Sequence, residues 1–195
     1  LFPADAFTSE FLEMLHHDRE ILEQLNADWE KENDDPKFDK FQENLTHNFF
    51  DKEINPSGKL VLFSESVDTL NYLYDRLTKE IGRSDVLMVT AANRNRLEQT
   101  IKENFDANFD SDSMRYNIII TSDVLAEGVN LHRSNVIVNY DSPWNATRLM
   151  QRIGRVNRIG SVAPNIYNYM FYPSQQGDKE IQLYKNALVK LQGFH

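Results

Sequence analysis

The second part of the chain alternates short apolar runs with longer segments of helical periodicity. The runs are rich in β-branched residues and have the length of strands. They span residues 59–63, 85–89, 116–120, 135–139 and 165–171. Strands separated by helices form βαβ units, whose crossovers require a mostly parallel sheet with helices on its faces. We therefore predict an α/β fold that binds ligands in the loops at the carboxyl ends of its strands.

The first 50 residues predict two helices instead. Apolar residues recur at spacings near 3.6 among acidic neighbours, and Thr8 or Ser9 is the expected N-cap. The apolar residues are Phe7, Phe11, Leu15, Leu22, Leu25 and Trp29. The turn formers of residues 33–36 end this pattern, and a second helical stretch follows over residues 37–50. We predict an acidic helical extension over residues 1–35 and a globular lobe over residues 36–195.

Charge is distributed very unevenly between the two parts. Residues 1–53 carry 15 acidic and 5 basic side chains, a net charge of -10, whereas residues 54–195 carry 15 acidic and 16 basic side chains, a net charge of +1. An acidic chain as a whole argues against nucleic acid as a partner, but that argument applies only to the first part.

Composition excludes several classes of protein. No run of about 18 apolar residues exists, so we expect no membrane span. The chain has no cysteine, which excludes disulfides, thiolate zinc sites and cysteine nucleophiles and fits a reducing compartment. It opens at Leu1 without the pattern of a signal peptide. We interpret it as a cytoplasmic chain cut from something longer.

The segments on either side of the first run do not contain a phosphate-binding P-loop. Residues 64–66 carry two serines and an acid, which is typical of an N-cap for the helix that begins at Val67. Lys59 follows Gly58, but the segment lacks the first glycine and the final Ser or Thr of a Walker A motif. The chain contains no other Gly-Lys pair. ATP hydrolysis by this chain alone is therefore disfavoured.

The loop after the third run, residues 121–130, combines hydroxyls with a glycine. Thr121 and Ser122 can donate to phosphate oxygens, and Gly128 permits a backbone conformation or a close approach that a Cβ would block. An N-capped helical turn that ends at a glycine is the structural alternative.

The segment from Gln151 to Gly160 has arginines at positions 152, 155 and 158. On a helix this spacing places them along one edge, where like charges repel, and Gly154 costs roughly 1 kcal/mol relative to alanine. Acidic residues are sparse nearby, so a polyanion is a natural partner, and the planar guanidinium fork suits a γ-phosphate. A solvated basic edge is the alternative.

Several segments resemble motifs of the second RecA-like lobe of superfamily 2 helicases and translocases, closest to the Snf2-like branch, and motifs IV, V and VI follow one another along the chain in the order that the family has. Residues 151–158 match the Q-R-x-G-R-x-x-R pattern of motif VI. Residues 122–130 match motif V, residues 59–64 resemble motif IV, and residues 139–145 resemble the Snf2-type approach to motif VI. The resemblance covers residues 35–172 and implies a RecA-like parallel sheet flanked by helices.

The resemblance implies that Arg155 and Arg158 are arginine fingers that reach ATP bound by an N-terminal RecA-like lobe absent from this chain. Gln151 would help to place them, and Gly128 and Asn130 would lie near the nucleotide. Magnesium would accompany ATP on the missing lobe, and no metal is expected within this chain. We expect the second motor lobe of an ATP-dependent helicase or translocase, inactive as this fragment alone.

The same resemblance assigns contacts with nucleic acid. It places Ser64 and the Ser122 hydroxyl at the nucleic-acid backbone and gives Glu127 a role in coupling the two sites. Arg96, on the predicted helix after the second run, is a further candidate for nucleic acid or else a solvated arginine. Asn130 stands where RNA helicases usually have aspartate, which favours DNA over RNA.

Other functions remain open at this point. A non-catalytic RecA-like scaffold would dock a partner through Trp29 and the acidic helix, without ATPase activity stimulated by nucleic acid. A self-contained nucleotide-binding domain would bind ATP analogues by itself. A nuclease is less favoured, because Asp123, Glu127 and Asp141 form no evident metal-binding cluster.

Overall fold

The computed structural model describes residues 7–32, 34–111, 115–126, 128–143 and 145–172, which divide into two compact units, residues 1–40 and 41–195. The helices are α1 (Ser9–Lys31), α2 (Pro36–His47), α3 (Val67–Asp75), α4 (Arg94–Phe105) and α5 (Ala146–Val156). The strands are β1 (Leu60–Phe63), β2 (Val86–Val89), β3 (Ile118–Thr121), β4 (Val136–Asn139) and β5 (Tyr167–Met170). A π-helical turn, Arg76–Glu80, extends α3, and a 3₁₀ turn, Asp123–Leu125, follows β3.

The first unit contains α1 and the beginning of α2, and its helix signals were predicted correctly. Thr8 is the N-cap of α1, and its hydroxyl accepts a hydrogen bond from the backbone N–H of Phe11 at 3.3 Å. The helix ends at Lys31, just before the predicted stop. Pro36 occupies the first position of α2, where its missing N–H costs nothing.

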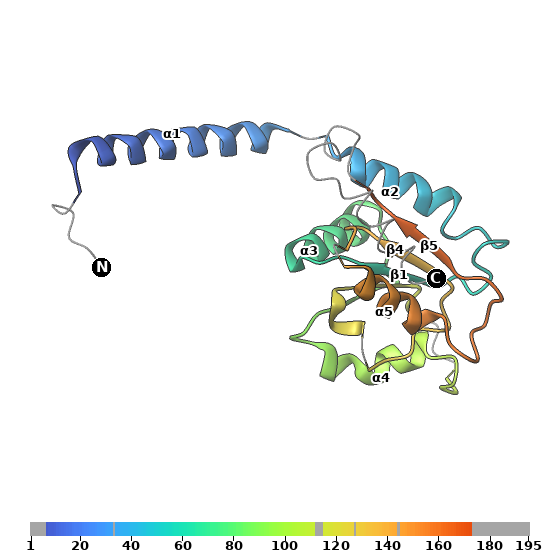
Figure 1. The fold of residues 1–195 in the computed structure, drawn as a ribbon. Helices are drawn as coiled ribbons and strands as arrows, with labels where there is room; N and C mark the ends of the chain where they lie inside the picture. Colours follow the sequence, from blue (N-terminus) through green and yellow to red (C-terminus); the bar gives the residue numbers. More distant parts are fainter. Residues whose placement is uncertain (1–6, 33, 112–114, 127, 144, 173–195) are drawn as a thin grey trace. The chain divides into compact units, whose positions relative to one another are not determined.

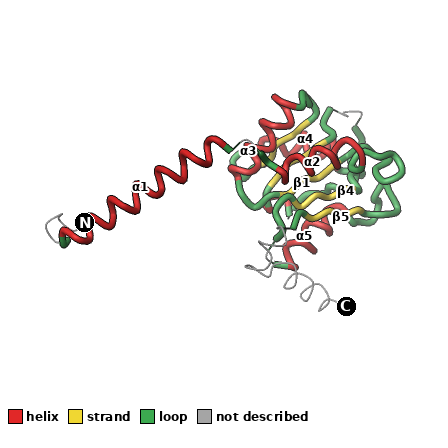
Figure 2. Tube along the Cα trace, turned by 90° about the horizontal axis from the view of Figure 1, so that it is seen from above, coloured by secondary structure: helices red, strands yellow, loops and turns green. Residues whose placement is uncertain are grey.

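The second unit is a five-stranded sheet in the order β2-β3-β1-β4-β5, and every neighbouring pair is parallel (Figure 1). This confirms the predicted α/β class. Four strands lie inside the predicted apolar runs, and β3 extends one residue beyond its run, to Thr121. The registers pair Phe63 with both Thr121 and Asn139, so that β1, β3 and β4 end level with one another. The loops after these three strands therefore open at the same edge of the sheet (Figure 2).

Helices cover both faces of the sheet, with α4 and α5 on one side and α3 on the other (Figure 1). The face under α4 and α5 is lined by alternate strand residues, including Val61, Phe63 and Ile119, as period-two alternation requires. Ile101 and Phe105 of α4 and Val156 of α5 close this core. Burial of these side chains, at about 1.5–3 kcal/mol each, holds α4 and α5 against the strands.

Lys59 is a buried cation immediately before β1. Its side chain is fully buried, its Nζ donates to the backbone oxygen of Tyr116, and it lies 5.4 Å from the centre of the Phe105 ring. The pKa of Lys59 is lowered to about 8, mainly by burial and also by the positive charge of Arg133, while Asp85 acts in the opposite direction.

We expect this lysine to make stability depend on pH. Its pKa is about 8 in the folded chain and near 10.5 when unfolded, so the unfolded state binds more protons between these values. Stability should rise with pH across this window, by on the order of 1–2 kcal/mol between pH 7.5 and 9.5. Urea unfolding at both pH values measures it. Lys59→Met is the control, and a pH dependence that persists unchanged in this variant contradicts the assignment.

Candidate functional site

A buried arginine joins α5 to the carboxyl edge of the sheet. The Arg152 side chain is fully buried, and its Nε donates to Oδ1 of Asp123 at 2.7 Å. Its Nη1 donates to Oδ1 of Asn139 at 2.9 Å, and its guanidinium carbon lies 5.0 Å from the centre of the Phe63 ring. Phe63 and Asn139 end β1 and β4, and Asp123 follows β3. One side chain therefore fixes α5 against three strand ends.

Arg148, one turn earlier on α5, shares the same carboxylate from the solvent side. Its Nη1 lies 3.2 Å from Oδ2 of Asp123 and 3.8 Å from Oε1 of Glu65, and about half of its side chain is exposed. Both oxygens of Asp123 are thus occupied by guanidinium groups from one helix. The buried pair with Arg152 is the stronger of the two, because water screens the exposed one.

The three arginines of residues 151–160 do not lie along one helical edge, and this prediction was wrong. The helix ends at Val156 with Asn157 as its C-cap. Arg152 points into the core, Arg155 is half-buried in the last turn, and Arg158 is exposed beyond the helix end. The backbone oxygen of Arg155 accepts from the N–H of Leu131 at 2.9 Å, which ties this last turn to the segment after β3.

Arg158 is held beside the end of the motif V segment by neutral acceptors. Its Nη1 donates to Oδ1 of Asn130, and its Nε donates to the backbone oxygen of Gly154 at 3.3 Å. Within the described residues no carboxylate lies within ion-pair distance of this guanidinium. The side chain of Asn130 donates in turn to Oδ2 of Asp106, at the end of α4, at 3.1 Å.

Gly128 has the backbone conformation that the sequence predicted. Its φ is +77°, a region that side chains with a Cβ rarely adopt, and a Cβ there would lie only 2.6 Å from Nη2 of Arg94. The first residue of α4 and the motif V loop therefore approach each other closely at this glycine. Glu127, predicted to couple the two sites, lies outside the described residues.

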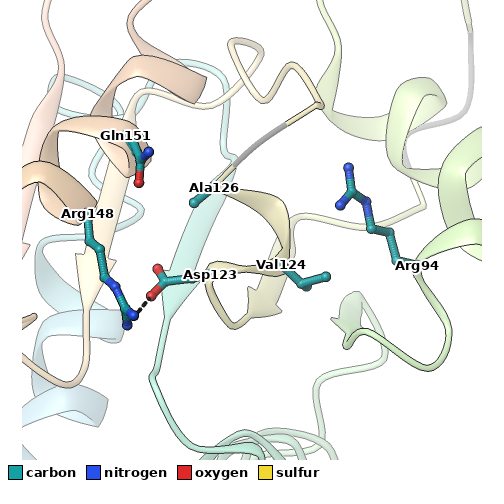
Figure 3. Close-up of a pocket in the computed structure, with 6 residues that line it drawn as sticks. All are labelled: Arg94, Asp123, Val124, Ala126, Arg148 and Gln151. Atoms are coloured by element: carbon teal, nitrogen blue, oxygen red, sulfur yellow. Dashed lines mark hydrogen bonds and ion pairs between the residues drawn. The ribbon is translucent and has the colours of Figure 1, made fainter.

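A cleft of about 290 Å³ opens between α4 and α5 at the carboxyl edge of the sheet (Figure 3). It is lined by Arg94, Asp123, Val124, Ala126, Arg148 and Gln151. Gln151 and Arg148 face it from α5, Arg94 faces it from the start of α4, and the turn after β3 forms the floor (Figure 3). Two arginines and a glutamine line it beside a single carboxylate, Asp123, which is already paired with Arg148, so the remaining donors suit an anionic ligand.

The residues predicted at nucleic acid lie in three different settings. Arg96 is exposed on α4. Ser122 is half-buried, and its hydroxyl accepts from the N–H of Val124 at 3.5 Å as the N-cap of the 3₁₀ turn. Ser64 is buried, and its hydroxyl donates to the carboxylate of Asp141. Contact of Ser64 with a ligand would require this hydrogen bond to open.

Sequence reasoning missed Asp106 and His132. His132 is fully buried, neither ring nitrogen has a hydrogen-bond partner, and its Nδ1 lies 3.6 Å from Oδ1 of Asp106. Burial lowers the pKa of His132, an effect that Asp106 opposes and that Arg158 and Arg133 reinforce. His132 is therefore uncharged at neutral pH. The only signal for this pair was an acid at a helix end and a histidine after motif V, and neither pattern is specific.

Metal ligands do not gather anywhere in the described part of the chain, where no three His, Asp or Glu side chains could hold an ion together. Over the same residues, no helix is both long and apolar enough to cross a membrane.

Residues 36–160 match the family of helicase conserved C-terminal domains, and the chain belongs to this family. Among curated proteins, the uncharacterized ATP-dependent helicase YqhH of Bacillus subtilis is 46% identical over 52 residues, which are 26% of this chain and 9% of that protein. The ATP-dependent RNA helicase DBP5 of Debaryomyces hansenii is 29% identical over 117 residues, which are 56% of this chain and 22% of that protein. The chain therefore spans less than a quarter of either relative.

Two solved structures share the fold. The C-terminal part of the Fun30 ATPase domain has a TM-score of 0.60 at 20% identity, over 75% of this chain and 44% of that one. S. cerevisiae Dbp5 bound to RNA and ADP BeF3 has a TM-score of 0.54 at 24% identity, over 77% of this chain and 36% of that one. The fold is thus the RecA-like fold of a helicase C-terminal lobe, as predicted.

We expect Arg152 to be a structural residue. Arg152→Met keeps the bulk of the side chain but leaves Asp123 and Asn139 without their buried donor, and should lower the free energy of unfolding by about 2–4 kcal/mol. Arg148→Met removes the exposed partner of the same carboxylate and should cost less than about 1 kcal/mol. Urea unfolding compares the two variants, and equal losses would contradict the distinction.

Proposed function

We propose that this chain is the second motor lobe of an ATP-dependent helicase or translocase and supplies Arg155 and Arg158 to ATP bound by a first lobe outside this chain. The family match supports the general class. The observation that carries the finer proposal is the exposed guanidinium of Arg158. In the described structure, its hydrogen bonds are accepted only by neutral oxygens. A cation without an ion pair is suited to an incoming phosphate.

The surrounding residues fit a triphosphate as ligand. Gln151 and Arg155 lie on the last two turns of α5, upstream of Arg158, and Asn130 contacts Arg158 directly. We assign Gln151 to the placing of the two arginines, and Asn130 and Gly128 to the edge of the nucleotide. When bound, ATP would supply the γ-phosphoryl group, whose developing charge the two guanidinium groups stabilise as it leaves. Magnesium would be held by the first lobe.

The proposal also includes binding to the phosphate backbone of nucleic acid. Arg96 would contribute a charge and Ser122 a hydroxyl donor, and contacts with phosphates fix position without reading sequence. Ser64 would join them after release from Asp141, and Glu127 would couple the two sites. We favour DNA over RNA on the strength of Asn130, although RNA helicases are among the relatives of this chain. Hydrolysis would remove the charge that holds the lobes together, so that alternating closure and opening moves the protein along the strand.

We expect Arg155→Ala and Arg158→Ala, each made in the complete protein, to lower ATP turnover about 10³-fold or more, the scale of other arginine fingers. Arg115→Ala is the control, because Arg115 is exposed before β3 and its guanidinium lies 5.1 Å from the centre of the Tyr116 ring. Steady-state ATPase assays with saturating nucleic acid measure the effect.

Unchanged turnover in both finger variants would overturn the proposal. If nucleic acid does not stimulate the ATPase activity of the unmodified complete protein, the non-catalytic scaffold is favoured instead. The affinities of the complete protein for duplex DNA and for single-stranded RNA test the preference for DNA. They are compared at the same salt concentration, because salt alone changes the affinity for nucleic acid strongly.

A further inference from the structure

A short chain of hydrogen bonds runs from the end of α4 to the proposed finger Arg158. Oδ2 of Asp106 accepts from Nδ2 of Asn130 at 3.1 Å, and Oδ1 of Asn130 accepts from Nη1 of Arg158. Asp106 is nearly buried, Asn130 is half-buried and Arg158 is exposed. These hydrogen bonds therefore lead from a buried carboxylate outward to an exposed cation.

The carboxylate decides which way the amide of Asn130 faces. A side-chain amide has one oxygen acceptor and one NH₂ donor, and a carboxylate accepts only. Because Asp106 takes the NH₂ group, the oxygen must point the other way, toward Arg158. With the amide reversed, two oxygens would meet at Asp106 and two donor groups would meet at Arg158.

Asp106 is itself fixed by its surroundings. Its Oδ1 accepts from the backbone N–H of Asn108 at 3.0 Å, and its backbone oxygen accepts from Nη2 of Arg133 at 2.9 Å. The neighbouring imidazole of His132 is uncharged at neutral pH because burial lowers its pKa. His132 therefore forms no ion pair that would turn the carboxylate away from Asn130.

We propose that Asp106 is a positioning residue for Arg158, acting by holding the amide of Asn130 with its oxygen toward the guanidinium. This inference rests on the proposed function for its catalytic consequence, but the ordering of Arg158 can be measured independently. The negative charge of Asp106 also polarises the amide, which strengthens the outer hydrogen bond without placing a carboxylate against the finger.

Two single substitutions and their combination test the proposal. In Asp106→Asn, the new amide oxygen must accept from the N–H of Asn108, so its NH₂ group meets the NH₂ group of Asn130. In Asn130→Asp, two carboxylates meet at the position of the 3.1 Å hydrogen bond. The double exchange restores one donor and one acceptor there, and leaves a carboxylate oxygen facing Arg158. Asp110→Asn, at an exposed site on the following loop, is the charge-matched control.

The first readout is the order of the Arg158 side chain in this chain without nucleotide. Nitrogen relaxation of its Nε–H group should give an order parameter that falls below about 0.6 in Asp106→Asn, whereas in Asn130→Asp the new carboxylate can pair with Arg158 and keep it ordered. The value should return toward that of the unmodified chain in the double exchange and stay unchanged in Asp110→Asn. Thermal unfolding of each variant confirms that the fold is intact.

The second readout is ATP turnover by the complete protein. We expect each single variant to lower kcat about 10-fold, as loss of one well-placed hydrogen bond does, with KM for ATP changed less than about twofold. The double exchange leaves a carboxylate against Arg158, so it should restore the order of this side chain but recover little of the turnover. A merely structural role for Asp106 would not be rescued by a second substitution at position 130.

The outcomes separate the two proposals. If Arg158→Ala leaves turnover unchanged, the proposed function fails, while the order parameters still decide whether Asp106 positions Arg158. If Arg158→Ala abolishes turnover but both single variants keep an ordered, fully active Arg158, the role of Asp106 is overturned. A folded Asp106→Asn variant whose Arg158 loses order without regaining it in the double exchange also overturns it.

Discussion

The buried guanidinium of Arg152 is the interaction on which the rest of the site depends. It places a positive charge in the interior beneath α5, and that charge is tolerated because Asp123 and Asn139 accept its hydrogen bonds and Phe63 lies against its face. Since these three partners stand at the ends of different strands, α5 can dock in only one position. The turn after β3, the last turn of α5 and the segment that carries Arg158 all take their places from this docking.

Much of the fold could be predicted because its signals are local. Each strand was an apolar run bounded by turn formers, and caps such as Thr8 and Ser66 begin helices where a hydroxyl can accept from the first turn. The split of the arginines could not be predicted in this way. Periodicity places residues on a helix face but does not tell where the helix ends, and the acid that balances Arg152 lies 29 residues earlier in the sequence.

The candidate site shows the same boundary between local and tertiary information. Gly128 was found from sequence because a positive φ is a property of one residue and its neighbours. Asp106 and His132 were not found from sequence, because their roles depend on the contact between the end of α4 and the segment after β3. Ser64 has the predicted place after β1, but its hydroxyl is turned to Asp141, which no pattern of single residues reveals.

The contrast between Arg152 and Arg158 suggests how one segment serves two purposes. A guanidinium paired with a carboxylate in the interior is costly to remove, which suits a residue that must never move. An exposed guanidinium on an amide oxygen gains only about 0.5–1.5 kcal/mol, so the charged oxygens of a phosphate can displace that acceptor readily. Placing Asp106 one hydrogen bond behind Asn130 keeps Arg158 oriented without an ion pair that a phosphate would have to break. The amide of Asn130 thus lies between the carboxylate of Asp106, which orients Arg158, and the guanidinium that is proposed to bind the phosphate.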